Sequence, residues 1–128
     1  MERRLISSGS PYEPVVGYSR AVVVGDRIFV SGSAPIMPDG ADPPAGSYEQ
    51  ARRCLEIIGQ ALREAGASFA DVVRTRVYLT PEGDFEEIGR AHGEIFSAIR
   101  PANTSVVVHA LLDPRWLVEI EAEALRTG

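Results

Sequence analysis

Two stretches of the chain alternate hydrophobic and polar residues, a pattern typical of β-strands that bury one face. The first covers residues 72–79. The second covers residues 116–125, where Glu119, Glu121 and Glu123 alternate with apolar residues. Both stretches therefore predict strands of a sheet, and the second places its glutamates on one face and its apolar side chains on the other.

Three further segments complete the predicted sheet. Apolar runs at 21–24 and 27–31 are separated by Gly-Asp, and because glycine supplies the positive φ of a tight turn, they predict a β-hairpin. A fifth strand is expected at 104–111. Glycines and prolines crowd residues 9–17, so the opening of the chain is expected to be an irregular arm, and the proline-rich segment 33–46 is expected to be a loop.

Two segments repeat apolar residues at steps of three and four, which predicts helices with one buried face. The first helix is expected to begin at Ser47, with Gln50 at capping-box spacing, and to end at Gly66. The second is expected to begin at Asp84 and to end before Pro101. Its predicted inner stripe consists of Phe85, Ile88, His92, Ile95 and Ile99.

The predicted element order, β-β-α-β-α-β-β, is an α+β layer with two helices on one face of a sheet. With 128 residues the chain has the size of a single domain, 1–128. The face that the helices leave open carries Val107, Leu117 and Leu125 among the glutamates. Such a half-apolar face indicates burial against another copy of the chain, although a solvated face, common in antiparallel sheets, explains the pattern as well.

The composition of the chain argues against several classes of binding partner and site. The net charge of -5 gives no broad attraction to nucleic acids or anionic membranes. The single cysteine, Cys54, excludes an intramolecular disulfide and a cysteine-based metal framework, and its place on the apolar helix face predicts inert packing. No segment has the apolar run of a signal peptide or a membrane span, which predicts a cytoplasmic location and no membrane partner.

Few residues offer candidate chemistry. The glutamate row is typical of a solvated strand, but Glu119 stands nearest to the loop at 114–116, where a partly desolvated carboxylate would act as general acid or base. His92 lies on the apolar helix stripe, which favours a hydrogen-bonded core histidine, and His109 favours a strand surface. Phosphate-loop and nucleophile-elbow motifs are absent from the sequence, and two separated histidines do not predict a metal site.

A more specific pattern comes from segments taken together. They are Gly17–Ala21 leading into Ile28–Gly32, then Asp71–Leu79, then Arg100–Ala102 followed by Leu117–Ala122. In this order and spacing they resemble the Rid family of reactive intermediate deaminases, also called YjgF and formerly described as translation-inhibiting endoribonucleases. The resemblance covers nearly the whole chain, about 18–125.

The resemblance implies a chorismate-mutase-like fold and a homotrimer whose open sheet faces turn inward as a central barrel. Three clefts at the subunit boundaries would hold the sites. The best-known members hydrolyse 2-imino acids to 2-keto acids and ammonia, so the resemblance implies a reaction that needs no metal or organic cofactor. Glutamates inside such a barrel would need arginine partners, and Arg74 and Arg76 lie on a strand of the same predicted sheet.

The family's site residues carry over only in part. The water-positioning glutamate, the expected catalytic residue, falls on Glu119. The pocket tyrosine falls on Tyr18, and the strand-end serine falls on Ser31 beside Gly32. The asparagine that the neighbouring subunit supplies in the family aligns with Gly89. The expected substrate-binding residues are Tyr18, Ser31, Gly32, Asn103, Ser105, Arg20, His92 and Trp116.

One residue of the family pattern is missing. The arginine that binds the substrate carboxylate belongs to a P-A-R-[ST] motif, which here has Asn103 in its place, and the pocket cysteine of some members is Ser105. Arginine offers a charged bidentate fork, whereas asparagine offers one neutral amide. Charge-assisted hydrogen bonds contribute ~1.5–3 kcal/mol and neutral ones ~1. We therefore expect weak binding of carboxylate substrates, unless Arg20, Arg76 or Arg100 replaces the missing cation.

Two functions of different classes follow. The first is a Rid-type hydrolase that acts on an imine, an enamine or a related small electrophile, with water oriented by Glu119. The alternative is a non-catalytic trimeric module that binds a small molecule or a partner. RNA cleavage rests only on the older family description, and the net charge of -5 argues against it.

Overall fold

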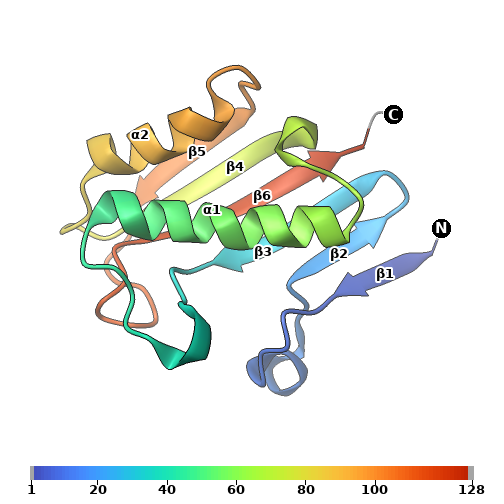
Figure 1. The fold of residues 1–128 in the computed structure, drawn as a ribbon, viewed down its shortest axis with the longest axis horizontal. Helices are drawn as coiled ribbons and strands as arrows, with labels where there is room; N and C mark the ends of the chain where they lie inside the picture. Colours follow the sequence, from blue (N-terminus) through green and yellow to red (C-terminus); the bar gives the residue numbers. More distant parts are fainter. Residues whose placement is uncertain (1, 127–128) are drawn as a thin grey trace.

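A single mixed sheet forms the centre of the molecule (Figure 1). The computed structural model describes residues 2–126. The sheet has six strands in the order β1-β2-β3-β6-β4-β5, and every neighbouring pair is antiparallel except β4 and β5. The strands are β1 (Arg3–Ile6), β2 (Ala21–Val24), β3 (Arg27–Ser33), β4 (Val72–Leu79), β5 (Ala102–Val107) and β6 (Val118–Leu125).

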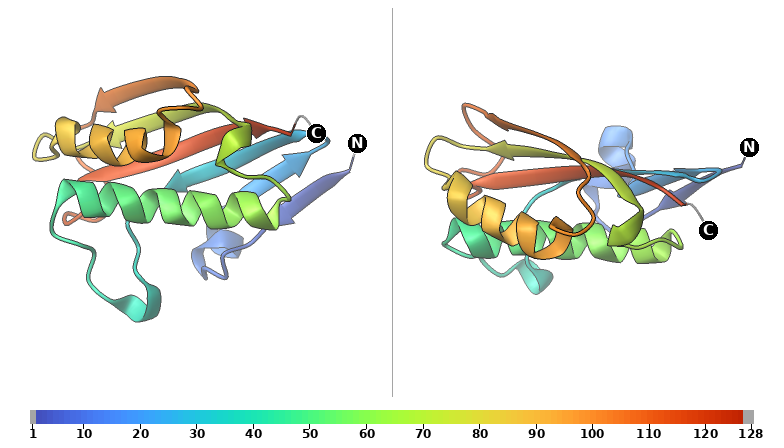
Figure 2. Two further views of the ribbon diagram at one scale, coloured as in Figure 1. Left: turned by 45° about the horizontal axis from the view of Figure 1, so that its top comes forward. Right: turned by 90° about the horizontal axis from the view of Figure 1, so that it is seen from above.

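Both long helices, α1 (Ser47–Glu64) and α2 (Phe85–Phe96), cover the same face of this sheet and leave the other face open (Figure 2). Helix α2 connects β4 to β5, and a crossover helix of this kind is what allows two successive strands to run parallel. Short helical turns lie in the connecting segments: η1 (Glu13–Gly17), η2 (Pro38–Gly40) and η3 (Phe69–Asp71). None of the described helices is long and apolar enough to cross a membrane.

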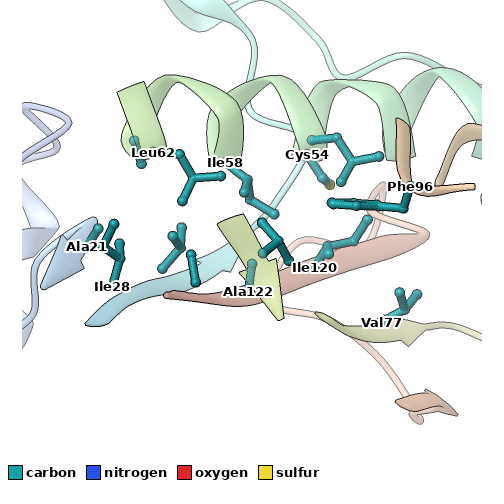
Figure 3. Packing of buried hydrophobic residues seen from close by; sticks show 14 of the residues in the cluster. Ala21, Ile28, Cys54, Ile58, Leu62, Val77, Phe96, Ile120 and Ala122 are labelled. Carbon is teal, nitrogen blue, oxygen red and sulfur yellow. The ribbon is translucent and has the colours of Figure 1, made fainter. Parts of the chain in front are cut away.

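The core lies between α1 and the sheet. Ile58 and Leu62 of α1 point toward the sheet, where Ile28 and Ile120 meet them, and all four side chains are fully buried (Figure 3). Burying one such side chain stabilises the fold by roughly 1.5–3 kcal/mol. Cys54 belongs to the same layer, and burial raises the pKa of its thiol. The sequence-based prediction that this cysteine is inert packing is consistent with this environment.

The predicted α+β architecture is confirmed, with corrections at its start. The opening of the chain is not wholly irregular, because β1 pairs with β2 and places Ile6 beside Ala21 in the core. The element order therefore has one strand more than expected. Only one of the four residues of β1 is buried, so the strand leaves almost no alternation in the sequence.

The capping-box prediction for α1 was wrong. Gly46 is the N-cap and no side chain caps the helix. Ser47 instead accepts a hydrogen bond from the backbone N–H of Asp84, 3.0 Å away. The Gln50 amide, fully buried, ties the helix to the loop before β6 by accepting from the N–H of Leu117 and donating to backbone carbonyls. Both residues therefore serve tertiary contacts rather than the helix end.

Other strand boundaries also differ from expectation. Strand β3 ends at Ser33 rather than at residue 31. The fifth predicted strand begins at Ala102 and ends at Val107, and the last strand begins at Val118, so Trp116 lies in a loop.

Two side chains differ from expectation as well. Val107, paired with the buried Leu79, lies on the helix-covered side of the sheet and not on the open face. Phe85 is exposed rather than buried in the helix stripe. Phe85 is the first residue of α2, so the apolar period that predicts its burial is not supported by the preceding turn of the helix.

The open face combines ion pairs with exposed apolar side chains. Arg76 binds Glu121 at 3.0 Å, and Arg74 lies 3.7 Å from Glu123, which confirms the expected pairing of β4 arginines with β6 glutamates. Beside these pairs, apolar side chains surround a hollow of about 210 Å³. The most exposed of them are Phe29, Val73 and Leu125. Within one chain these three side chains have no covering element.

Candidate active site

A β-bulge in β3 opens the sheet beside Glu119. Val30 pairs with Ala122 and Ser33 with Ile120, so two residues of β3, Ser31 and Gly32, oppose the single residue of β6 between those partners. Bulges of this type are common next to active sites, because they redirect side chains and interrupt the hydrogen-bonded ladder. Ser31 and Gly32 therefore form the bulge, and they interrupt the regular pairing of β3 with β6.

Gly32 makes room for the carboxylate of Glu119. A Cβ atom at position 32 would collide with the Oε2 atom of Glu119, so any other residue would push that carboxylate away. Glu119 is partly buried, and burial raises the pKa of its carboxyl group above the ordinary value. The charge of Arg20 acts in the opposite direction, and Glu121 adds to the increase. A carboxylate of this kind is suited to proton transfer or to orienting water.

Arg20 approaches the same glycine from the other side. Its Nη2 donates to the carbonyl oxygen of Gly32 at 2.6 Å, while its Nε is buried without a hydrogen-bond partner among the described residues. Burial lowers the pKa of the guanidinium, and the charges of Tyr18, Glu13 and Glu119 partly offset this. Arg20 is therefore a partly desolvated cation placed between two carboxylates.

The second of these carboxylates, Glu13, is firmly held in the segment before β2. It accepts hydrogen bonds from the Ser7 hydroxyl at 2.8 Å and from the N–H of Ser8 at 3.0 Å, and its side chain is buried. Burial alone would raise the pKa of Glu13, but the hydrogen bonds and the charge of Arg20 outweigh it and lower the pKa. Glu13 is thus a fixed negative charge, whereas no described side chain donates a hydrogen bond to Glu119.

Glu119 and Gly32 line a cavity of about 380 Å³. Its other polar residues are Tyr78 and Glu121, whose side chains are joined by a 2.5 Å hydrogen bond from the phenol to the carboxylate. The apolar wall consists of Val108, Ala110, Leu111 and Leu112. Tyr78, Glu121 and this wall were not predicted as site residues from the sequence, because cross-strand register and the path of a loop decide what faces Glu119. The alternation over 72–79 was the one signal for Tyr78.

A larger groove of about 580 Å³ lies on the other side of Arg20, between α1 and residues Ser7 and Ser8. Of the predicted site residues, only Arg20 lines it. Size alone favours this groove, but its nearest carboxylates are either hydrogen-bonded or exposed at the rim of the helix. The smaller cavity contains the partly buried carboxylate with a raised pKa, which is the better marker of a reactive site.

Three predicted site residues lie on the opposite face of the sheet. Asn103 is paired with Thr75 across β4 and β5, and its amide donates to the Thr75 hydroxyl at 3.0 Å. The same hydroxyl lies 2.8 Å from Nε2 of His92 on α2, and Ser105 donates to the Asn103 side-chain oxygen at 3.0 Å. Burial lowers the pKa of His92. Within one chain this cluster and Glu119 are separated by the sheet.

The remaining predicted residues do not line the cavity at Glu119. The hydroxyl of Ser31 donates to the backbone carbonyl of Ser19 at 2.6 Å, so it fixes the β2–β3 connection. Tyr18 follows η1 and is partly exposed. Trp116 donates its backbone N–H to Asp113 in the loop before β6. Among residues 2–126, no group of three His, Cys, Asp or Glu side chains could hold a metal ion.

The family is decided by comparison with known proteins. The model of the family described as Endoribonuclease L-PSP matches residues 9–126. The chain belongs to this family, also called YjgF or Rid. An uncharacterised protein of Streptomyces coelicolor is 39% identical over 123 residues, which cover 96% of this chain and 92% of that protein. The resemblance stated from the sequence is thereby confirmed.

Other members of this family connect the fold to a reaction. A protein of Capra hircus named 2-iminobutanoate/2-iminopropanoate deaminase is 34% identical over 125 residues, covering 97% of this chain and 90% of that protein. A crystal structure of a YjgF/YER057c/UK114 family member from Mycobacterium tuberculosis has 42% sequence identity and a TM-score of 0.88, and the match covers 98% of this chain and 100% of that one. Relatives within the YjgF/Rid family thus include proteins named as imine deaminases.

Proposed function

We propose that this protein hydrolyses a reactive imine or enamine in the cavity at Glu119. The observation that carries the proposal is the partly buried Glu119 carboxylate, which lies over Gly32 at a bulge, lines a cavity and has a raised pKa. The similarity to a protein named as an imine deaminase supports the reaction class.

The reaction needs one water molecule and no redox partner. Glu119 accepts a hydrogen bond from the water and directs its oxygen at the imine carbon. As the new C–O bond forms, Glu119 takes a proton from the water and the imine nitrogen gains a proton, which gives a carbinolamine. The carbinolamine nitrogen then takes up the hydroxyl proton, the C–N bond breaks, and ammonia leaves with a carbonyl product. An enamine reacts after it tautomerises to the imine. All 13 basic residues of the sequence are arginines, so no lysine competes with water as the nucleophile.

The proposed site lies in a cleft between the subunits of a homotrimer. Two observations support this assembly: exposed apolar residues on the open face, and the separation of Glu119 from Asn103 by the sheet within one chain. A closed ring of three subunits would cover the exposed apolar residues of the open face. It would also bring residues of the neighbouring subunit to the cavity as a second wall. Light scattering should report three times the 13.8 kDa of the chain.

Phe29→Glu tests the same assembly, since it places a charge on the apolar open face. This variant should shift the measured mass toward that of a monomer. Arg63→Glu, on the exposed side of α1, is the matched control and should leave the mass unchanged. A wild-type mass of 13.8 kDa under native conditions would exclude the shared cleft.

We further propose that this protein is not a standard 2-imino acid deaminase. Asn103 stands where the family pattern has a carboxylate-binding arginine, and its amide is already engaged with Thr75. The test is a coupled assay with freshly generated 2-iminobutanoate, beside imines that have no carboxylate. Turnover of 2-iminobutanoate at the rate of arginine-bearing relatives would contradict the proposed role of position 103.

Glu119→Gln tests the reaction itself. This variant should lose about 100-fold or more of the catalysed rate, the usual contribution of a general base. Glu123→Gln, on the same strand and face but outside the cavity, is the matched control and should keep activity. Equal rates for the wild type and Glu119→Gln across an imine and enamine panel would contradict the proposal. RNA serves as a further substrate in the panel and should remain uncleaved.

The alternative is a trimeric module that binds a small molecule or partner without turnover. The observation that favours it is the closed hydrogen-bond network of Asn103 and Ser105, where a catalytic family member presents an arginine. A ligand that binds equally to the wild type and Glu119→Gln, with no accelerated reaction, would support this function over catalysis.

A further inference from the structure

The polar part of the cavity at Glu119 is dominated by carboxylates. Two of its lining residues, Glu119 and Glu121, are carboxylates. No arginine or histidine lines it among residues 2–126. A ligand carboxylate placed there would therefore meet negative charge without a cation to receive it.

The arginines closest to the cavity are engaged elsewhere. Arg76 pairs with Glu121 at 3.0 Å, and this pairing leaves Glu119 as the unpaired charge of the cavity. Arg20 donates to the Gly32 carbonyl from the side of the larger groove, which it lines, and does not line the Glu119 cavity. Arg74 is paired with Glu123, farther along the open face. Glu119 is thus the lining carboxylate of this cavity that has no ion-pair partner among residues 2–126, although the charge of Arg20 acts on it from the other side of Gly32.

The wall opposite the carboxylates is apolar. Its residues come from the segment that follows β5, and Leu112 is 95% exposed. An exposed leucine that lines a cavity provides apolar area that an apolar substituent of a ligand can cover, and removing that area from water favours binding. The cavity therefore offers a carboxylate on one side and a hydrocarbon surface on the other.

We propose that the substrate of this site is an imine without a carboxylate, bound as the protonated iminium with an apolar substituent against the 108–112 wall. The inference rests on the proposed function and names its substrate class. The positive iminium nitrogen faces Glu119, and protonation makes the adjacent carbon the more reactive electrophile. Water adds to that carbon, the C–N bond breaks, and an aldehyde or ketone leaves with ammonium. The reaction class that supplies such a substrate is the oxidation of a primary amine.

The first experiment measures binding without turnover, using two stable probes that differ in charge. Isoamylammonium and 4-methylpentanoate are titrated separately into ¹⁵N-labelled protein. The ammonium should shift the amides of Gly32 and of residues 108–112, with an affinity at least tenfold higher than the carboxylate. Equal or tighter binding of the carboxylate, or no shift at these amides with either probe, would overturn the inference.

The second experiment compares turnover of a matched pair of imines. Oxidation of isoamylamine gives 3-methylbutan-1-imine, and oxidation of leucine gives the corresponding 2-imino acid, so the two differ by one carboxylate. With catalase present and the uncatalysed rate subtracted, kcat/KM should favour the carboxylate-free imine at least tenfold. A preference for the imino acid would overturn the inference while leaving the proposed function intact. Selective binding of isoamylammonium without acceleration of either imine would refute the proposed function. The preference of the cavity for a cationic over an anionic ligand would still be supported.

A pair of variants locates the preference in the cavity. Glu121→Gln removes a lining carboxylate and leaves Arg76 unpaired, so the preference for isoamylammonium over 4-methylpentanoate should fall severalfold. Glu123→Gln makes the same change two residues along the strand, outside the cavity, and should leave the preference unaltered. Equal effects of the two variants would show a general surface charge effect and would overturn the assignment to this cavity.

Discussion

Glu119 and Asn103 lie on opposite faces of one sheet, and their polar surroundings differ. Asn103 belongs to a closed network in which Thr75, His92 and Ser105 satisfy one another. Glu119 is partly buried and accepts no hydrogen bond from any described side chain, although the sheet around it is well ordered into ion pairs. A partly buried carboxylate that lines a cavity and has a raised pKa is the better candidate for chemistry, and the hydrogen-bonded cluster is the better candidate for stability.

Thr75→Val should give the largest effect, and it should be an effect on stability. The substitution removes the hydroxyl that joins His92 to Asn103. The exposed Asn103 can bind water instead, but the partly buried His92 loses its partner, which costs about 1–3 kcal/mol of unfolding free energy. Urea denaturation measures the change. Thr104→Val, at the next position after Asn103 and exposed, is the control and should be nearly neutral. Loss of activity in folded Thr75→Val, rather than loss of stability, would place catalysis on the Asn103 face.

Asn103→Arg should restore part of the family pattern. The guanidinium offers a charged fork for a carboxylate, so kcat/KM for 2-iminobutanoate should rise about tenfold. Asn103→Gln, which adds length without charge, should not produce this gain. If neither variant changes the rate, position 103 does not contact the substrate, and the cleft between subunits is not built from both faces.

Arg20→Gln should move the pH dependence of activity without abolishing it. The charge of Arg20 favours the ionised form of Glu119, so its removal raises the pKa of that carboxyl group further. If the carboxylate is the active form, the acidic limb of the pH–rate profile moves to higher pH. Arg90→Gln, on the outer surface of α2, serves as the control. An unchanged acidic limb in Arg20→Gln would separate Arg20 from the site.

The smallest expected effect is on stability: apart from its loss of activity, Glu119→Gln should be slightly more stable than the wild type at neutral pH. The pKa of Glu119 is raised in the folded state, so the folded protein binds this proton more tightly than the unfolded chain does. Wild-type stability is therefore lost as pH rises through the folded pKa, and the neutral glutamine avoids that loss. We expect a Tm higher by about 2 °C at pH 7, with the difference disappearing below the ordinary glutamate value of 4.5. A lower Tm at pH 7 would show that the charge is stabilising.

The sequence determined the secondary structure where one periodicity dominated. The alternation over 72–79 and the glutamate row of β6 fixed which side chains share a face, and the three-and-four spacing fixed the span of α1. These patterns are local, since each follows from how a strand or helix turns its own side chains. Asp84 also caps α2 as predicted, accepting from the N–H of Glu87 at 3.2 Å.

Only the tertiary structure decided which residues of distant segments became neighbours. The strand order places β6 between β3 and β4, and the bulge at Gly32 then brings Arg20 and Glu119 to one glycine. Strand register and bulges depend on pairing between distant segments, so no short-range pattern reports them. The same holds for Ser47. Its sequence context predicts a helix cap, but in the fold its hydroxyl accepts a hydrogen bond from the backbone N–H of Asp84, 37 residues away. Local periodicity specifies elements, whereas the packing of those elements places charges together and gives Glu119 its chemistry.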